Sequence, residues 1–266
     1  MRKYSLTLLA AAALGLAASA ASAADLPRKA PVYAPPAPPP FSWTGFYVGL
    51  AGGAGWGTTE VGDPNQICFT DGCTLLDSVG TFAQTQLNGW LFGGTVGYNW
   101  QINPWMVLGL EGDFDWVNFE GTSPCGTTIF TFEFASTCHT KAKWTADLTG
   151  RVGFAVDRAL LYLKGGAVWK KADHDATFNE VGLGCFVCLG YTDTRVGGLF
   201  GAGIEYAFLP NWSAKIEYNY MDFGTNNVNV AGFFDGTEPI TATVPVREVI
   251  HTVKAGVNYR FDWGRY

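Results

Sequence analysis

The sequence predicts an all-β fold, an eight-stranded antiparallel β-barrel whose strands cross a membrane. Three observations predict it: eight segments alternate between apolar and polar side chains, the connections alternate between short and long, and the 10 tryptophans gather at strand ends. The composition agrees, because 34 glycines and 15% aromatic residues with only 15% charged residues favour many short strands over helices.

The N-terminus has the pattern of a secretory signal peptide over residues 1–23. Arg2 and Lys3 give a positive start, an apolar run follows over 6–18, and Ala21-Ser22-Ala23 forms a small-residue cleavage site. The apolar run is shorter than the ~20 residues that a membrane-spanning helix needs. The mature chain is therefore predicted to begin at Ala24, in an exported protein.

Residues 24–42 are predicted to be a proline-rich periplasmic tether ahead of a barrel over 43–266. Proline has no backbone donor and a fixed φ, so PVYAPPAPPP at 31–40 cannot form a helix or a central strand. Fully extended, these residues would reach about 30 Å. The formal charge of -6 becomes -8 without Arg2 and Lys3, which argues against nucleic acid as a partner.

The strand prediction rests on period-two alternation, in which one phase faces lipid and the other faces the lumen. In the third segment, for example, Leu108 and Leu110 share one phase, while Glu111 and Asp113 share the other. A soluble sandwich also alternates, so alternation alone does not decide. The predicted strands cover 43–56, 87–101, 105–119, 143–156, 159–170, 195–208, 212–223 and 247–261.

The connections favour the membrane barrel over the sandwich. Short turns at 102–104, 157–158 and 209–211 alternate with long connections. Strict alternation on an even strand count is typical of outer-membrane barrels, with short periplasmic turns and long extracellular loops. The four predicted loops cover 57–86, 120–142, 171–194 and 224–246.

The tryptophans are predicted to form two aromatic girdles, one at each membrane interface. The periplasmic girdle would hold Trp43, Trp100, Trp105, Trp212 and Trp263. The outer girdle would hold Trp56, Trp90, Trp116, Trp144 and Trp169.

The inward phase carries charged residues of both signs, and an eight-stranded barrel is just wide enough for side chains to fill. Unpaired buried charges are costly, so we expect a paired network that closes the lumen. An ion- or proton-conducting path is the alternative. The predicted network contains Glu111, Asp113, Asp115, Asp147, Arg151, Lys164, Arg195, Glu205, Lys215, Glu217, Lys254 and Arg260, and Lys143 has the same phase.

The six cysteines are predicted to form disulfides, because an even count in an exported chain favours them over zinc ligands. The predicted pairs are Cys68 with Cys73, Cys125 with Cys138, and Cys185 with Cys188. The three-residue spacing of the last pair can strain the bridge.

No catalytic, cofactor or metal site is predicted. The three histidines fall in separate places, His139 and His174 in different predicted loops and His251 in an outward phase, with no grouping for nucleophilic catalysis. The long loops carry phenylalanines that would pack together, touch lipopolysaccharide or bind an unknown extracellular ligand.

Four segments carry a family resemblance: FSWTGFYVG at 41–49, ADLP at 24–27, LYLKGG at 161–166 and VNYRF at 257–261. With these, the chain resembles the small outer-membrane immunogenic, or porin-family, proteins with an OmpA-like barrel. The resemblance implies an abundant surface protein without enzymatic activity. Such proteins usually stop at a final phenylalanine that the outer-membrane assembly machinery reads, whereas Phe261 is followed here by DWGRY, ending at Tyr266.

The sequence therefore predicts a structural outer-membrane barrel that supports envelope integrity and surface presentation. A narrow porin for small solutes is the first alternative. An adhesin or ligand receptor acting through the loops is the second.

Overall fold

The computed structural model describes residues 41–75, 81–124, 135–180, 184–234 and 238–261, within one compact unit that begins at Phe41. Phe41 and Ser42, assigned to the tether from the sequence, belong to this unit. Among these residues no helix is long and apolar enough to span a membrane.

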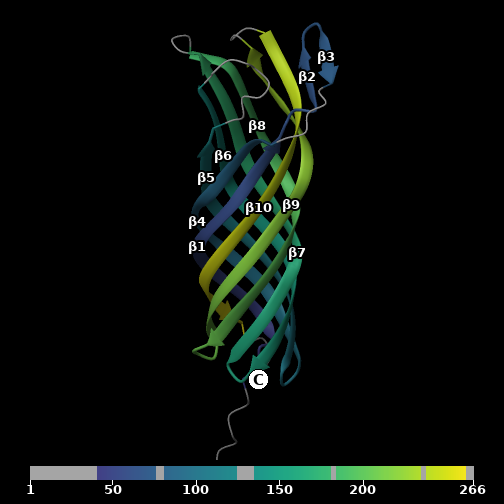
Figure 1. The fold of residues 1–266 in the computed structure, drawn as a ribbon. Coiled ribbons are helices and arrows are strands. Elements are labelled where there is room, and N and C mark those ends of the chain that lie inside the picture. The colour runs from purple at the N-terminus through teal and green to yellow at the C-terminus, as the bar shows by residue number, and fades with distance from the viewer. Residues whose placement is uncertain (1–40, 76–80, 125–134, 181–183, 235–237, 262–266) are drawn as a thin grey trace, which may run out of the picture. The chain divides into compact units, whose positions relative to one another are not determined.

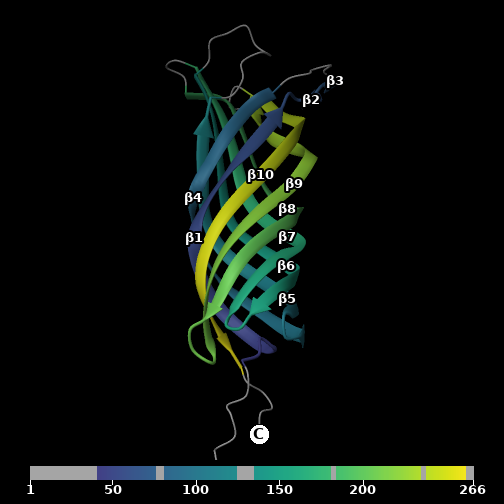
Figure 2. The same ribbon diagram turned by 60° about the horizontal axis from the view of Figure 1, so that its bottom comes forward.

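Eight long strands form a closed antiparallel ring (Figure 1), because each pairs with the next and β1 also pairs with β10. The ring confirms the predicted fold class. Its strands are β1 Gly45–Gly62, β4 Thr81–Asn103, β5 Met106–Ser123, β6 Ala135–Val156, β7 Ala159–Glu180, β8 Gly184–Ala207, β9 Trp212–Phe234 and β10 Glu238–Arg260. Two views show the strands winding steeply around the barrel (Figures 1 and 2).

The strands are longer than the sequence predicted, and this corrects the four long loops. Much of 57–86, 120–142, 171–194 and 224–246 is strand, paired well past the tryptophans. Alternation marks only the lipid-facing part of a strand. Beyond the membrane the outward face meets water and need not be apolar, while inward residues such as Val244 stay buried, so the contrast of apolar outside and polar inside is lost. We call the end of the ring that holds these additional strand residues the hairpin end. The opposite end, with its tight connections, is the short-turn end.

The outward phase is apolar, as a lipid-facing surface requires. Leu110 on β5 is 65% exposed and Ile216 on β9 is 64% exposed, while their neighbours Glu111 and Lys215 are buried. On β1 several inward positions hold glycine because the neighbouring strand is close: a Cβ on Gly53 would lie 1.9 Å from the Val253 carbonyl oxygen.

The predicted girdles need one correction, at Trp43. Trp100, Trp105 and Trp212 are exposed near the short-turn end, and Trp56, Trp90 and Trp116 are exposed farther along the strands. Trp43, in contrast, is 2% exposed and packs inside the ring against Val107 and Leu160. It precedes β1, so the strand's alternation does not set its direction. Trp263 lies outside the described residues.

Lys143 also points the other way from its predicted phase. The register between β6 and β7 shifts between Ala142 and Trp144, so Lys143 and Trp144 do not alternate as successive residues of a regular strand do. Lys143 is exposed and pairs with Asp173 outside the lumen.

A short hairpin of β2 Gln66–Phe69 and β3 Gly72–Leu75 lies at the hairpin end, where β2 pairs with β10 (Figure 1). The Cys68–Cys73 disulfide joins its strands, as predicted. Cys138 is also disulfide-bonded, while its predicted partner Cys125 lies outside the described residues. Cys185 and Cys188 fall on β8, and the structure does not describe their side chains.

Candidate functional site: the filled lumen

The lumen is filled by side chains in successive layers, and β10 shows their order. From the short-turn end its buried inward residues include Arg260, Lys254, Ile250, Glu248 and Val244. An ionic layer at Lys254 therefore lies near an apolar layer at Ile250, and beyond it come the charged Glu248 and the apolar Val246 and Val244.

Lys164 on β7 is the centre of the ionic layer. Its Nζ lies 3.0 Å from Glu111 Oε1, 2.9 Å from Asp113 Oδ2 and 2.9 Å from Glu217 Oε1. Asp147 Oδ1 is 3.9 Å away. The four carboxylates come from β5, β6 and β9, so one ammonium group joins strands across the ring.

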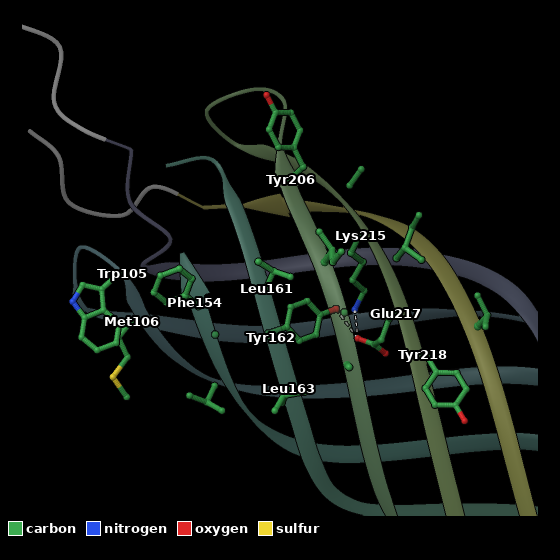
Figure 3. A pocket seen from close by; sticks show the side chains of 18 residues that line it. Trp105, Met106, Phe154, Leu161, Tyr162, Leu163, Tyr206, Lys215, Glu217 and Tyr218 are labelled. Atoms are coloured by element: carbon green, nitrogen blue, oxygen red, sulfur yellow. Dashed lines mark hydrogen bonds and ion pairs between the residues drawn. The ribbon is translucent and has the colours of Figure 1, made fainter. Parts of the chain in front are cut away.

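Two more lysines surround the same carboxylates. Lys215 Nζ lies 3.4 Å from Glu111 and 3.7 Å from Glu217, and Lys254 Nζ lies 3.4 Å from Asp113. Figure 3 shows the Lys215 ammonium directed toward Glu217. Glu111, Asp113 and Glu217 thus each have three cationic neighbours, which offsets the cost of burying their charge, whereas Asp147 has only Lys164.

Arg151 on β6 extends this network toward the short-turn end. Its Nη1 lies 3.1 Å from Glu111 and its Nη2 lies 3.0 Å from Glu205. The guanidinium lies between two aromatic rings, 5.1 Å from the Tyr47 centroid and 4.6 Å from the Tyr162 centroid. Such stacking favours arginine over lysine here.

The tyrosines also hydrogen-bond to the network, a role that the sequence did not indicate. The Tyr47 hydroxyl donates to Glu111 at 2.7 Å, and the Tyr162 hydroxyl donates to Glu217 at 2.8 Å (Figure 3). Both rings belong to the inward phase, a signal that reading only the charged residues overlooked.

Glu111, Asp113 and Glu217 approach one another closely enough to hold a metal ion, since one oxygen of each lies within 4.8 Å of the others. The Lys164 ammonium, however, lies within 3.0 Å of all three carboxylates. A lysine therefore supplies the positive charge that a metal would bring.

The short-turn end of the lumen is closed by an apolar layer. Trp43, Val107, Leu160 and Tyr162 pack together there, with Phe41 against them. Arg260 holds the entering chain, because its guanidinium donates to the carbonyls of Ser42 and Pro210 and lies 4.5 Å from the Phe41 ring centroid. The segment before β1 thus forms part of the lumen's filling.

A second apolar layer lies on the hairpin side of the ionic layer. Its buried residues come from seven strands, β4 to β10, and Lys170 on β7 lies between two of them, with its Nζ 5.1 Å from the Phe223 ring centroid. They are Leu87, Leu91, Val117, Phe119, Ala142, Val168, Ala172, Leu199, Met221, Phe223 and Ile250.

Beside and beyond this layer lie charged pairs that the sequence did not predict. Lys170 and Glu248 form a fully buried ion pair that the predicted network did not include. Arg195, which it did include, pairs with Asp193 rather than with the central carboxylates. Burial would raise the pKa of the Asp193 carboxyl, but contacts with His174 and Arg195 lower it to about 2.

All twelve predicted network positions are buried, but the structure divides them. Ten belong to the central layer: Glu111, Asp113, Asp115, Asp147, Arg151, Lys164, Glu205, Lys215, Glu217 and Lys254. Arg260 lies at the short-turn end and Arg195 toward the hairpin end.

The outer face also has a hollow, of about 1010 Å³, on the apolar surface of the barrel. Figure 3 shows Trp105, Phe154 and Tyr206 around it, with Leu161 and Leu163 between them. Lipid covers such a surface in a membrane barrel, so the functional candidate remains the lumen.

An apolar outer wall around a filled, charged lumen defines a transmembrane β-barrel. The comparison with known proteins agrees: the family described as "Outer membrane protein beta-barrel domain" matches residues 7–261. The chain belongs to this family, and its location is the bacterial outer membrane.

The relatives are also outer-membrane proteins. The chain is 31% identical to the 31 kDa outer-membrane immunogenic protein of Brucella melitensis, across 96% of this chain and 99% of the relative. It is 25% identical to the 25 kDa outer-membrane immunogenic protein of Brucella abortus, across 97% and 98%. The outer membrane protease OmpT of Escherichia coli superposes with a TM-score of 0.43 at 9% identity, across 84% of this chain and 99% of OmpT.

Proposed function

We propose that this protein is a non-enzymatic structural barrel of the outer membrane whose lumen is closed. One observation carries the proposal: a buried ionic layer centred on Lys164 lies between two apolar layers, around Trp43 and around Phe119. Ions would have to separate the paired charges and also cross both apolar layers. Each step is costly without water, since the effective dielectric inside a barrel is low.

The same packing supports a role without catalysis. A general acid or base must reach a substrate, yet Glu111, Asp113 and Glu217 are buried and held by lysines. The remaining roles are mechanical support of the envelope and presentation of the hairpin end. The relatives named immunogenic accord with a surface-presented hairpin end.

Conductance of the refolded protein in planar bilayers tests the closed lumen. We expect no steady single-channel current from the wild type. Lys164→Ala removes the central cation and should produce leak currents, whereas Lys143→Ala, outside the lumen, should not. Reproducible wild-type conductance whose ion selectivity changes in Glu111→Gln would reject the proposal in favour of a narrow porin.

A further inference from the structure

The apolar hollow of about 1010 Å³ on the outer wall lies mainly over strands β6 to β9, near the short-turn end. Two exposed alanines line it, Ala202 on β8 and Ala214 on β9. The strand register places Ala202 between Leu163 and Tyr218, and Ala214 opposite Tyr206. The small side chains therefore leave a depression that larger neighbours surround.

The hollow extends from the membrane interface into the apolar band. Trp105, in the turn before β5, and Tyr206, near the end of β8, line its short-turn side, and both rings are exposed (Figure 3). Exposed tryptophan and tyrosine are typical of the interface, because each ring has an apolar body and one polar group. Leu163 and Ile216 continue the lining toward the middle of the wall. This shape suits a lipid whose polar end lies at the interface and whose hydrocarbon chain points into the membrane.

One charge of each sign lies beside the short-turn side of the hollow, in the turn between β6 and β7. The Ala207 N–H donates to the Arg158 carbonyl at 2.8 Å, so this turn contacts the end of β8 directly after Tyr206. Asp157 and Arg158 are both exposed. Neither side chain has a hydrogen bond or an ion pair with the part of the chain that the structure describes. Both are therefore open to a ligand, and together they carry no net charge.

From these observations we propose that the hollow binds one molecule of a zwitterionic phospholipid of the phosphoethanolamine class. Arg158 pairs with the phosphate, whose oxygens match the guanidinium, and Asp157 pairs with the ammonium group. One acyl chain lies in the depression over Ala202, between Leu163 and Tyr218. Other lipids surround the wall as well, so packing in the hollow and the two ion pairs, rather than the hydrophobic effect, select this one. The site does not depend on whether the lumen conducts.

Native mass spectrometry of the protein, refolded in detergent without lipid, tests the site. Dioleoylphosphatidylethanolamine should add to each chain once and saturably. Dioleoylphosphatidylglycerol keeps the phosphate but has no ammonium group, so it should bind about threefold more weakly. Dioleoylglycerol lacks the phosphate as well and should bind about tenfold more weakly. The order of the three lipids measures what the charged turn contributes.

Substitutions in the depression test where the acyl chain lies. Ala202→Trp fills the hollow and should weaken binding of dioleoylphosphatidylethanolamine about tenfold. Ala167→Trp, on the outward face of β7 but outside the hollow, is the matched control and should bind as the wild type does. Ala214→Leu is a smaller change in the same hollow, should also weaken binding, and serves in its place if Ala202→Trp does not refold. Far-UV circular dichroism reports whether each variant has refolded.

Substitutions in the turn test the headgroup contacts. Arg158→Gln should weaken binding of dioleoylphosphatidylethanolamine about tenfold and remove its preference over dioleoylglycerol, while Arg247→Gln, on the exposed hairpin part of β10, should change neither. Asp157→Asn should instead remove the preference over dioleoylphosphatidylglycerol. Without lipid, Arg158→Gln should leave the stability unchanged. The proposal is overturned if the three lipids bind equally, if lipid adds without saturation, if Ala202→Trp and Ala214→Leu bind as the wild type does, or if two copies of the chain associate in place of a lipid.

Discussion

Arg151 shows how one lumenal side chain connects distant parts of the barrel. It bridges Glu111 on β5 and Glu205 on β8, and its guanidinium lies between the rings of Tyr47 and Tyr162. The shape of the guanidinium allows both interactions at once. We therefore expect the loss of one such buried charged residue to cost more stability than the loss of a single ion pair.

Arg151→Ala should destabilise the barrel by about 3–5 kcal/mol, because two buried carboxylates lose a cation. Urea unfolding of the refolded protein measures this change. Arg158→Ala, in the exposed turn between β6 and β7, is the control and should stay within about 0.5 kcal/mol of wild type. Equal unfolding midpoints for wild type and Arg151→Ala would contradict the importance of the network.

Asp193 predicts a dependence on pH at the hairpin end. Its pKa falls from the ordinary 3.8 to about 2, so its ionised form stabilises the fold above about pH 4. After solvent screening of this partly exposed group that contribution is about 1 kcal/mol, and most of it is lost as the pH falls from 4 to 2. Asp193→Asn should therefore be less stable than wild type at pH 7, with most of the difference gone at pH 2.

Unfolding curves recorded at several pH values between 2 and 7 supply the measurement. The control is Asp175→Asn, which removes an exposed carboxylate. A stability difference between wild type and Asp193→Asn that stays constant down to pH 2 would argue against a role for its ionisation.

Each strand has two functions along its length. Near the short-turn end its outward face meets lipid, and farther on it forms the hairpins. β5 illustrates the first part, with Leu110 on the lipid face directly before the buried Glu111. The outward face is therefore sensitive to charge only between the girdles.

Leu110→Arg, at mid-strand on the lipid face, should cost about 2–4 kcal/mol of folding free energy. Thr137→Arg, on the exposed hairpin part of β6, should cost far less because water can solvate it there. Refolding into lipid vesicles, followed by urea titration, compares the two. Similar costs at both positions would mean that the lipid-facing part of the strands has been assigned wrongly.

The whole molecule has a predicted orientation, with the hairpin end outside the cell and the short-turn end in the periplasm. The argument rests on connection length, since periplasmic turns of such barrels are short. The turn between β6 and β7 holds only Asp157 and Arg158, whereas the β2–β3 hairpin lies between β1 and β4 at the other end.

Protease added to intact cells should cut between β3 and β4, β5 and β6, β7 and β8, or β9 and β10, and spare residues 31–40. Mass spectrometry of the released fragments identifies the cut sites. The same treatment after permeabilising the outer membrane is the control, and it should expose 31–40 as well. Cutting at 31–40 in intact cells would reverse the orientation.

The sequence by itself determined the number of ring strands, their order and, apart from the irregular position Lys143, their lipid-facing phase. Alternation with period two is a local property of a strand, so Leu108 and Leu110 on β5 reveal their face without knowledge of their neighbours. Apolar positions also locate the membrane band. Past the membrane the outward face meets water and is no longer apolar, while inward residues such as Val244 stay buried. The pattern of apolar outside and polar inside ends there, which is why the hairpin parts of the strands were predicted as loops.

Only the tertiary structure decided which lumenal groups meet. Lys254 pairs with Asp115, 139 residues away in the sequence, because closure of the ring brings β10 across from β5. Closure likewise directs Trp43 inward and separates Arg195 from the central carboxylates. Charge and phase show that a side chain enters the lumen, but its partner depends on the stagger of all eight strands, which no single segment encodes.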